Sequence, residues 1–369
     1  MIKLINHIKG FKPLVYIGDE LILAKYNKLY IASLDLKEIN YICSVGTENK
    51  LKLLFSKNRL LQRLFRLQLG PAIQLKQKDC FLVFLKNICY FVDIKNKKVI
   101  KEEHNLSIKK PLQMNLISKG KYKDCLIFGE YSLNGEFNPV DIYKRSPEGS
   151  YEKIFTFQKG EINHIHGIFE GPNQDNLYIL TGDFKQGAGI WVGDINLNHV
   201  KPLFRGDQST RTCWIKAIGN NLVFATDRQD AINYLSYFSH NETGNMNKIF
   251  PIVGSSIYYS SAHSKKIIFS TSVEPEPNSG SSHSLKNLLN TKRANGIISD
   301  HSCVYSGDLE NGFEIIFSAK KDSLPYGLFQ FGNISFPSGI LKRQDYVHFY
   351  CMALSGHDDI TYCFNFEDD

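Results

Sequence analysis

Short apolar or alternating runs, rich in Ile, Val, Phe and Tyr, make up most of the chain, and turn residues interrupt them about every 8 to 12 residues. An apolar period of two is typical of strands, so the pattern predicts an all-β protein. Helix is scarce. The amphipathic segment 57–66, with basic residues on one side, is the best helical candidate.

The strands also group at a longer period. Seven units of roughly 50 residues each match the size of four-stranded propeller blades. The units span residues 14–45, 72–103, 125–157, 164–204, 213–250, 256–317 and 332–364. We therefore predict a single domain over residues 1–369, a seven-bladed β-propeller with four-stranded antiparallel blades. Six blades is the alternative, because the weakly patterned N-terminal unit could instead complete the last blade by strand exchange.

One segment interrupts this rhythm. Residues 274–300 are rich in Pro, Ser, Asn and Gly, which predicts a long loop inserted in the sixth unit. Loops of this length are either disordered or cover a site, so a lid is one interpretation.

Composition narrows the setting. At 43% hydrophobic residues the chain is too apolar for disorder. No apolar run reaches the roughly 20 residues that cross a bilayer, and the N-terminus lacks the features of a signal peptide, so we expect a cytoplasmic protein without a membrane span. The eight cysteines show no CxxC pairing, and several lie in apolar runs, which predicts reduced core residues.

The net charge of +7 does not predict a nucleic-acid partner. Lysine clusters such as residues 95–98 fall at predicted turns, where they are typical of solvated loops. Basic residues neither interleave with aromatics nor gather convincingly on one helix face. A positive potential would still attract an acidic carbohydrate.

Residues 161–191 hold the densest candidate chemistry. His164 and His166 are two apart in an alternating segment, so both imidazoles should emerge on one face of a strand. They could ligate a divalent metal with Asp183 or Glu274, act as acid and base, or form hydrogen bonds within a channel. The sequence requires no cofactor and leaves a divalent metal as an alternative.

Turn motifs carry a resemblance to a known family. Residues 306–313, Ser-Gly-Asp-Leu-Glu-Asn-Gly-Phe, look like a degenerate Asp-box (Ser-x-Asp-x-Gly-x-x-Trp), and residues 146–151 look like a weaker copy. In such a turn a Ser or Asp side chain caps backbone amides and Gly adopts the left-handed conformation. The box marks a fold and not an active site.

Further similar segments span residues 164–168, 180–183, 189–191, 225–227, 269–275 and 329–337. Together these features resemble the sialidase-like (BNR-repeat, Asp-box) β-propellers, in an uncharacterised bacterial branch associated with surface polysaccharides. The resemblance implies a carbohydrate ligand and no established reaction. The sequence departs from sialidases because an arginine triad for a substrate carboxylate cannot be placed; Arg145, Arg211 and Arg228 are scattered candidates.

A propeller brings strand ends and loops from every blade to one mouth of its channel, so residues distant in sequence can share a site. The predicted catalytic residues are Tyr131, His164, His166, Asp183 and Glu274. The predicted substrate-binding residues are Trp191, Arg211, Asp227 and Gln330.

Each of these residues also has a structural interpretation. Asp183 and Asp227 end apolar strands, where an Asx turn is the alternative. Pro275 should hold the preceding backbone extended and present Glu274 at the rim. Arg211, opening a strand, could bind a carboxylate or sulfate, or form a surface salt bridge.

The remaining three have similar alternatives. Tyr131 could protonate a leaving oxygen or simply pack. Gln330, in an aromatic strand, could donate to a sugar hydroxyl or satisfy nearby backbone. Trp191 could stack on a sugar ring or pack in a blade core.

These residues predict a propeller that acts on or binds a saccharide or polysaccharide. As an enzyme it would be a glycoside hydrolase with paired carboxylates, or a lyase or epimerase using His and Tyr. The alternative is a non-catalytic carbohydrate- or protein-binding propeller. Two carboxyls facing each other at about 5 to 10 Å would favour hydrolysis. A group of His, Tyr and Arg without such a pair would favour elimination or epimerisation. Imidazoles that are buried against carbonyls, with no cavity beside them, would favour a protein that only binds.

Overall fold

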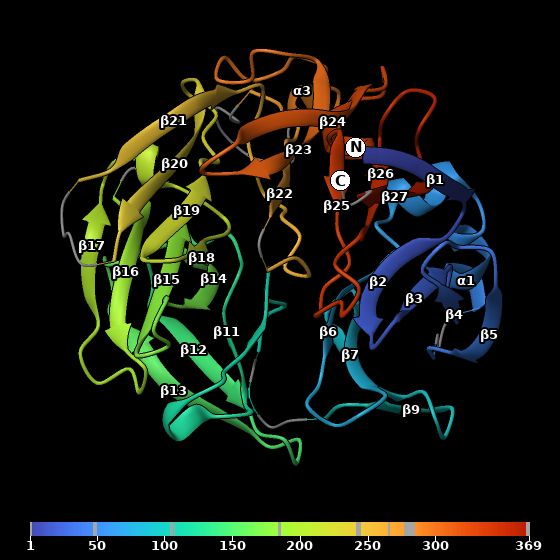
Figure 1. Cartoon of the computed structure of the whole chain (residues 1–369), viewed down its shortest axis with the longest axis horizontal. Helices are drawn as coiled ribbons and strands as arrows, with labels where there is room; N and C mark the ends of the chain where they lie inside the picture. Colours follow the sequence, from blue (N-terminus) through green and yellow to red (C-terminus); the bar gives the residue numbers. More distant parts are fainter. Residues whose placement is uncertain are drawn as a thin grey trace. The chain divides into compact units, whose positions relative to one another are not determined.

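A computed structural model describes residues 2–46, 50–103, 106, 108–183, 186–240, 245–264, 266–276 and 285–366, with main chain only for 50–52. Seven antiparallel sheets form the seven-bladed β-propeller that the strand pattern predicts (Figure 1). Two compact units divide the chain. Residues 1–74, 78–101 and 258–369 form the first, and residues 75–77 and 102–257 form the second. The expectation of one domain stays a prediction.

The first unit holds four sheets. One comprises β2 (Lys12–Ile17), β3 (Glu20–Lys25), β4 (Lys28–Ser33) and β5 (Ile39–Ser44). The next comprises β6 (Leu69–Gln74), β7 (Cys80–Leu85), β8 (Ile88–Asp93) and β9 (Lys98–Lys101). The third has β22 (Ile267–Ser270), β23 (His301–Asp308) and β24 (Gly312–Lys320). The last combines β25 (Asn333–Ser335), β26 (Tyr346–Met352) and β27 (Ile360–Phe366) with β1 (Ile2–Lys9).

The second unit holds three sheets of four strands. The first comprises β10 (Asn115–Leu116), β11 (Leu126–Gly129), β12 (Val140–Arg145) and β13 (Tyr151–Phe157). The second comprises β14 (His164–Glu170), β15 (Asn176–Gly182), β16 (Gly189–Asp194) and β17 (Lys201–Arg205). The third comprises β18 (Lys216–Ile218), β19 (Asn221–Ala225), β20 (Asn233–Ser239) and β21 (Asn247–Ile252).

Strand exchange does occur in the last sheet. Strand β1 pairs antiparallel with β27 from Ile2↔Phe366 to Lys9↔Ile360, with one bulge (Figure 1). Residues 12–44 form a sheet of their own as well, so the N-terminal region supplies both a complete blade and the closing strand of the last one. This is why the blade count is seven and not six.

The sheet of β22, β23 and β24 has three strands among the described residues, and an isolated bridge between Tyr259 and Phe269 lies beside β22. The predicted long loop, 274–300, connects β22 to β23 and contains α3 (Leu285–Leu288). Residues 277–284 of this loop lie outside the described part, and the lid stays a prediction.

Other helices are short, as the pattern predicts: α1 (Lys50–Ser56), α2 (Arg59–Leu64), α4 (Tyr326–Phe329), and the 3-10 turns η1 (Gly120–Tyr122) and η2 (Gln208–Thr210). The predicted helix 57–66 corresponds to α2, whose first turn is capped by Asn58, with its side chain accepting from the Leu61 amide at 3.1 Å. No helix in the described ranges has the length and apolar character needed to cross a membrane.

The Asp-box-like segment 306–313 forms the turn between β23 and β24. The Asp308 carboxylate accepts the backbone amides of Glu310 and Asn311 at 2.9 and 2.7 Å, and Gly312 has φ of 86°. The segment therefore forms the turn expected of it. All eight cysteines are buried and form no disulfide, as predicted.

In the sheet of β14 to β17, burial falls from the first strand to the last. All of β14 except Glu170 is buried, whereas β17 has no buried residue. The apolar side chains of β11, β12, β14 and β15 form a common core that includes Ile127, Ile142, Ile165 and Ile179. Polar residues on β14 are therefore surrounded by protein, and need partners there.

Candidate functional site

Seven of the nine predicted site residues lie in the second unit, and six of them, all but Trp191, meet in one region. Tyr131 follows β11, Asp183 follows β15 and Asp227 follows β19, so each comes just after the second strand of its sheet. His164 and His166 open β14. Arg211 is the C-cap of η2 and does not open a strand as predicted, because regular pairing begins only at β18.

The His164 and His166 rings meet at the start of β14. Their Nε2 atoms are 3.1 Å apart, and both residues are buried. The register with β15 shifts between Ile165 and Gly167, so His166 occupies a bulge. A bulge re-aims a side chain, and here it accompanies the approach of the two rings.

The other nitrogen of each ring faces a carbonyl. His164 Nδ1 lies 3.1 Å from the Ser132 carbonyl oxygen, and His166 Nδ1 lies 2.8 Å from that of Thr212. A carbonyl can only accept, so both Nδ1 atoms carry a hydrogen. In two neutral rings both Nε2 atoms would then present lone pairs to each other, which gives no hydrogen bond. This geometry leaves a position between the two Nε2 atoms that suits a cation.

Asp183 supplies a carboxylate to the same point. Its Oδ1 is 3.4 Å from His166 Nε2 and its Oδ2 is 3.5 Å from His164 Nε2. Burial opposes ionisation of this carboxyl, but the charge of Arg211 and the two imidazoles outweigh burial and hold its pKa well below the usual value. Asp183 is therefore a carboxylate at neutral pH.

Arg211 joins the two aspartates. One terminal guanidinium nitrogen lies 2.9 Å from Asp183 Oδ1 and 3.2 Å from Asp227 Oδ2. The Asp227 carboxylate is 3% exposed, and its Oδ1 is buried without a hydrogen-bond partner among the described residues. A buried carboxylate oxygen without a hydrogen bond is costly, so Asp227 Oδ1 is an open acceptor next to the Oδ2 atom that Arg211 contacts.

Cys213 also belongs to the site, although the sequence indicated only a core cysteine. Its Sγ is 3.3 Å from Asp227 Oδ2 and 3.5 Å from His166 Nδ1. Burial first, and then the charge of Asp227, raise the pKa of the thiol well above its usual value, so the thiol donates to the carboxylate. The alternation Arg211-x-Cys213 was the signal available, because both side chains reach Asp227.

Tyr131 covers the imidazole pair on the side of solvent. Its ring centroid lies 4.7 Å from that of His164 and 6.0 Å from that of His166, and the residue is 39% exposed. Desolvation of the hydroxyl, followed by the charge of Asp183, raises its pKa, so the phenol stays protonated. The hydroxyl of this half-exposed tyrosine can thus donate a proton or a hydrogen bond next to the buried His164 and His166.

Two groups of side chains have the donor atoms for a metal ion. His164, His166 and Asp183 form one, and His166, Cys213 and Asp227 form the other. In the first, the separations of 3.1 to 3.5 Å resemble those between ligands bonded at about 2.0 to 2.2 Å to one ion. The second fits less well, because its thiol is protonated and His166 Nδ1 is used by the Thr212 carbonyl.

Trp191 is a correction to the predicted site. It is 4% exposed and packs edge-on against Phe157 at 5.0 Å between centroids, within the core of the second unit. The Arg205 guanidinium lies over its ring at 5.4 Å. A ring covered in this way offers no face to a sugar.

Glu274 and Gln330 lie in the first unit. Glu274 is 4% exposed, so it is buried where the prediction placed it at a rim. Gln330 is not in a strand, because it follows α4 with φ of 68°, and its Oε1 is buried without a hydrogen-bond partner among the described residues. Their membership of the site stays a prediction.

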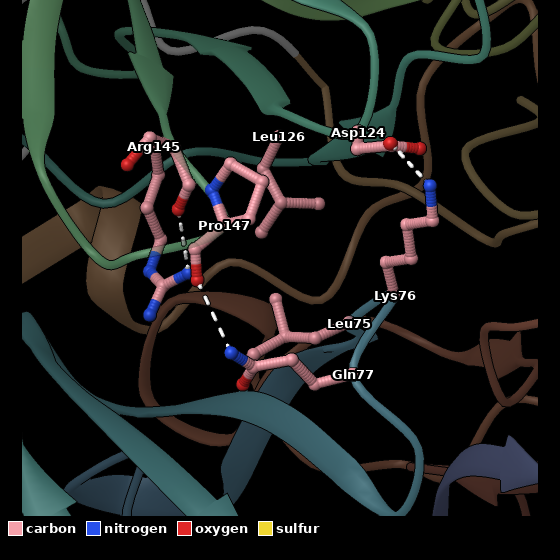
Figure 2. Close-up of a pocket in the computed structure, with 8 residues that line it drawn as sticks. Leu75, Lys76, Gln77, Asp124, Leu126, Arg145 and Pro147 are labelled. Atoms are coloured by element: carbon pink, nitrogen blue, oxygen red, sulfur yellow. Dashed lines mark hydrogen bonds and ion pairs between the residues drawn. The ribbon is translucent and has the colours of Figure 1, made fainter.

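A separate pocket in the second unit is too small for a saccharide (Figure 2). Its enclosed volume is about 10 Å³, room for about one water molecule. Figure 2 shows Lys76 paired with Asp124 on one side, and the Gln77 amide donating to the Pro147 carbonyl on the other. Arg145 at its edge is held by Glu102, with the shortest contact at 2.5 Å.

The sheets thus define a seven-bladed β-propeller with a compact polar site in its second unit. No protein-family model matches the sequence, and no curated protein is similar to it.

Solved structures share the fold. An oligogalacturonate lyase from Vibrio parahaemolyticus aligns with a TM-score of 0.58 at 9% identity, over 98% of this chain and 93% of that chain. An oligogalacturonate lyase in complex with manganese gives 0.56 at 6% identity, over 99% and 92%. The AfRom2 CNH domain gives 0.56 at 8% identity, over 100% of both chains. Identities this low show the fold alone.

Proposed function

We propose that the site of the second unit binds an acidic saccharide together with a divalent cation held by His164, His166 and Asp183. The observation that carries the proposal is the meeting of two imidazole Nε2 atoms, 3.1 Å apart, with an ionised carboxylate. Both Nδ1 atoms donate to carbonyls, so the Nε2 lone pairs are oriented as first ligands of an ion would be. Manganese, which accompanies one structural neighbour, is the first ion to test.

An acidic ligand follows from the groups around that point. Arg211 offers a planar guanidinium suited to a carboxylate, and a bound divalent ion adds positive charge beside it. Oligogalacturonate, a uronic acid polymer named for two structural neighbours, is the saccharide class we select for this chain.

Among the reactions that the sequence left open, this geometry favours elimination over hydrolysis. Hydrolysis uses one protonated carboxyl and one carboxylate on either side of the glycosidic bond. Asp183 stays ionised, and Asp183 and Asp227 share one nitrogen of Arg211. In elimination, the C–H proton beside the uronate carboxylate would pass to a water molecule as the C–O bond breaks, and the Tyr131 phenol would supply a proton to the leaving oxygen. Arg211 would orient the uronate carboxylate. A divalent ion held by His164, His166 and Asp183 would supply positive charge that makes this C–H more acidic.

A non-catalytic binding propeller is the second candidate. His164 and His166 are 3% and 2% exposed, and both rings are held by carbonyls. Rings fixed in this way suit a rigid binding site as well as a reactive one. The sialidase-like relationship has less support, since Arg211 is the one arginine found between the described site carboxylates.

A screen of the purified full chain against acidic and neutral polysaccharides, with manganese present, tests the proposal. Wild type should bind an acidic polysaccharide, and elimination would release unsaturated uronates that absorb in the ultraviolet, whereas hydrolysis would give new reducing ends without that absorbance. His166→Ala should lose both binding and product. His199→Ala, an exposed histidine of the same unit, is the matched control. Equal behaviour of wild type and His166→Ala on every polysaccharide would refute the proposed site.

A further inference from the structure

Arg211 already forms ion pairs with two carboxylates, those of Asp183 and Asp227. Its terminal nitrogen contacts Asp183 Oδ1 at 2.9 Å and Asp227 Oδ2 at 3.2 Å, and the Arg211 side chain is only 11% exposed. A guanidinium whose charge is offset in this way attracts a further anion weakly, because the ligand carboxylate meets two like charges as well as one opposite charge. Arg211 therefore needs to be released before it can bind an acidic saccharide.

The local charge has the wrong sign for such a ligand. Among the described residues in contact here, Asp183 and Asp227 are two carboxylates facing the single guanidinium of Arg211, so with neutral imidazoles the group has an excess of one negative charge. The protonated thiol of Cys213 adds no charge, and Tyr131 stays protonated.

One oxygen connects the imidazole pair to Arg211. Asp183 Oδ1 is the atom nearest to the guanidinium, and it is also the atom 3.4 Å from His166 Nε2. If Asp183 gives this oxygen to an ion between the imidazoles, the carboxylate can no longer neutralise Arg211 fully. Asp227 would still contact the same terminal nitrogen of the guanidinium, at 3.2 Å.

We infer that the site is assembled in a fixed order: a divalent cation binds first to His164, His166 and Asp183, and only then does Arg211 become available to the carboxylate of a uronic acid. This inference rests on the proposed function and adds its order of binding. A divalent ion at this position changes the net charge of the group formed by Asp183, Asp227 and Arg211 from negative to positive. Asp227 acts as the counter-charge that suppresses anion binding in the absence of the ion.

Calorimetric titration of the full chain with a galacturonate trisaccharide tests this order. The protein is first treated with a chelator, and is then titrated with and without saturating manganese chloride, with a neutral glucose trisaccharide as control. Manganese alone should raise the melting temperature. The acidic trisaccharide should bind at least about tenfold more tightly with the ion than without it, and the neutral one should show no such difference.

Variants separate the roles of the two aspartates. Asp183→Asn should abolish the manganese-induced rise in melting temperature, and the ion should then have no effect on the trisaccharide. Asp227→Asn removes one negative charge and should allow measurable trisaccharide binding without the ion, so the ratio of affinities with and without manganese should fall below about half of the wild-type ratio. Asp175→Asn, at an exposed position of the same unit, should match wild type. Circular dichroism establishes that each variant is folded.

The outcomes distinguish the two proposals. Trisaccharide affinity that is equal with and without manganese would overturn the ordered assembly and leave the acidic-saccharide function standing. A rise in melting temperature with manganese, but no binding of any acidic saccharide, would overturn both. An unchanged ratio in Asp227→Asn would overturn the role of Asp227 as the suppressing charge.

Discussion

Gly182 lies directly against the His166 imidazole: a Cβ atom at Gly182 would be 2.2 Å from Cε1 and 2.5 Å from Nε2 of that ring. Gly182, on β15, pairs with His164 on β14. Strand β15 therefore has no room for a side chain at this position, because the His166 ring fills the space.

Gly182→Ala should therefore displace His166 without removing any polar group of the site. We expect loss of the manganese-induced rise in melting temperature and loss of acidic-saccharide binding, because contacts under 3 Å force the ring to move. Gly135→Ala is the matched control, since a Cβ there meets no atom within 4 Å. Full manganese binding by folded Gly182→Ala would contradict the close packing of this ring.

His348 should make the protein sensitive to mild acid. The ring is buried between the Tyr16 hydroxyl at 3.0 Å and the Leu34 carbonyl at 2.6 Å, and burial lowers its pKa to about 4. The unfolded chain, with a histidine pKa of about 6.5, binds more protons between these values. The contribution of neutral His348 to the free energy of unfolding is therefore complete above pH 6.5 and is lost as the pH falls toward 4. About 2 kcal/mol of it is lost by pH 5.

Urea unfolding at neutral pH and near pH 5 measures this effect. His348→Gln should be less stable than wild type at neutral pH, because Gln fills the space imperfectly, but the loss of stability on acidification should be smaller. An equal loss in both proteins would show that other groups cause the acid sensitivity.

Trp191 should matter for stability and not for the ligand. Trp191→Ala should lower the free energy of unfolding by about 3 to 5 kcal/mol, because it leaves a cavity in the core. Trp191→Phe retains most of the buried area and should bind the acidic saccharide as wild type does in calorimetry. Loss of affinity in a stable Trp191→Phe protein would restore the sugar-stacking role that its burial excludes.

Arg145 and Glu102 form a buried ion pair that should stabilise the second unit. Their side chains are 4% and 9% exposed, and the Tyr151 hydroxyl also donates to Glu102. Arg145→Ala leaves the Glu102 carboxylate buried without its main partner and should cost about 3 to 5 kcal/mol in urea unfolding. The double variant Arg145→Met with Glu102→Met should be more stable than Arg145→Ala, and a cycle of single and double variants gives the pair's coupling energy. Additive effects would mean that the two side chains do not stabilise each other.

The blade pattern was accessible from the sequence because each blade is built of hairpins between neighbouring strands. Turn residues and period-two alternation are local signals, and they locate units such as 14–45 and 164–204 close to the observed sheets. The partner of β1 was less accessible, because its pairing with β27 joins segments that are far apart in the sequence, and nothing local in residues 2–9 specifies it.

The site was accessible in part for the same reason. The spacing of His164 and His166 directs both rings to one side of β14, and the Asp residues after β15 and β19 occupy corresponding places in neighbouring sheets. The contacts of Cys213 and Arg211 with Asp227 depend on the path of the backbone after η2. The periodicity of the sequence does not describe that path. Trp191 was misplaced because a tryptophan in a strand is equally compatible with a core and with a sugar platform until packing is known.

The pairing of β1 with β27 has a consequence for the synthesis and folding of this protein on the ribosome. Residues 2–9 are synthesised before their hydrogen-bonding partner, residues 360–366, so this segment stays unpaired while the sheets between them in sequence form. A nascent or truncated chain lacking β27 would keep a free strand whose amides and carbonyls can pair with a second molecule. The topology therefore requires that β1 be protected from such pairing until β27 has been synthesised.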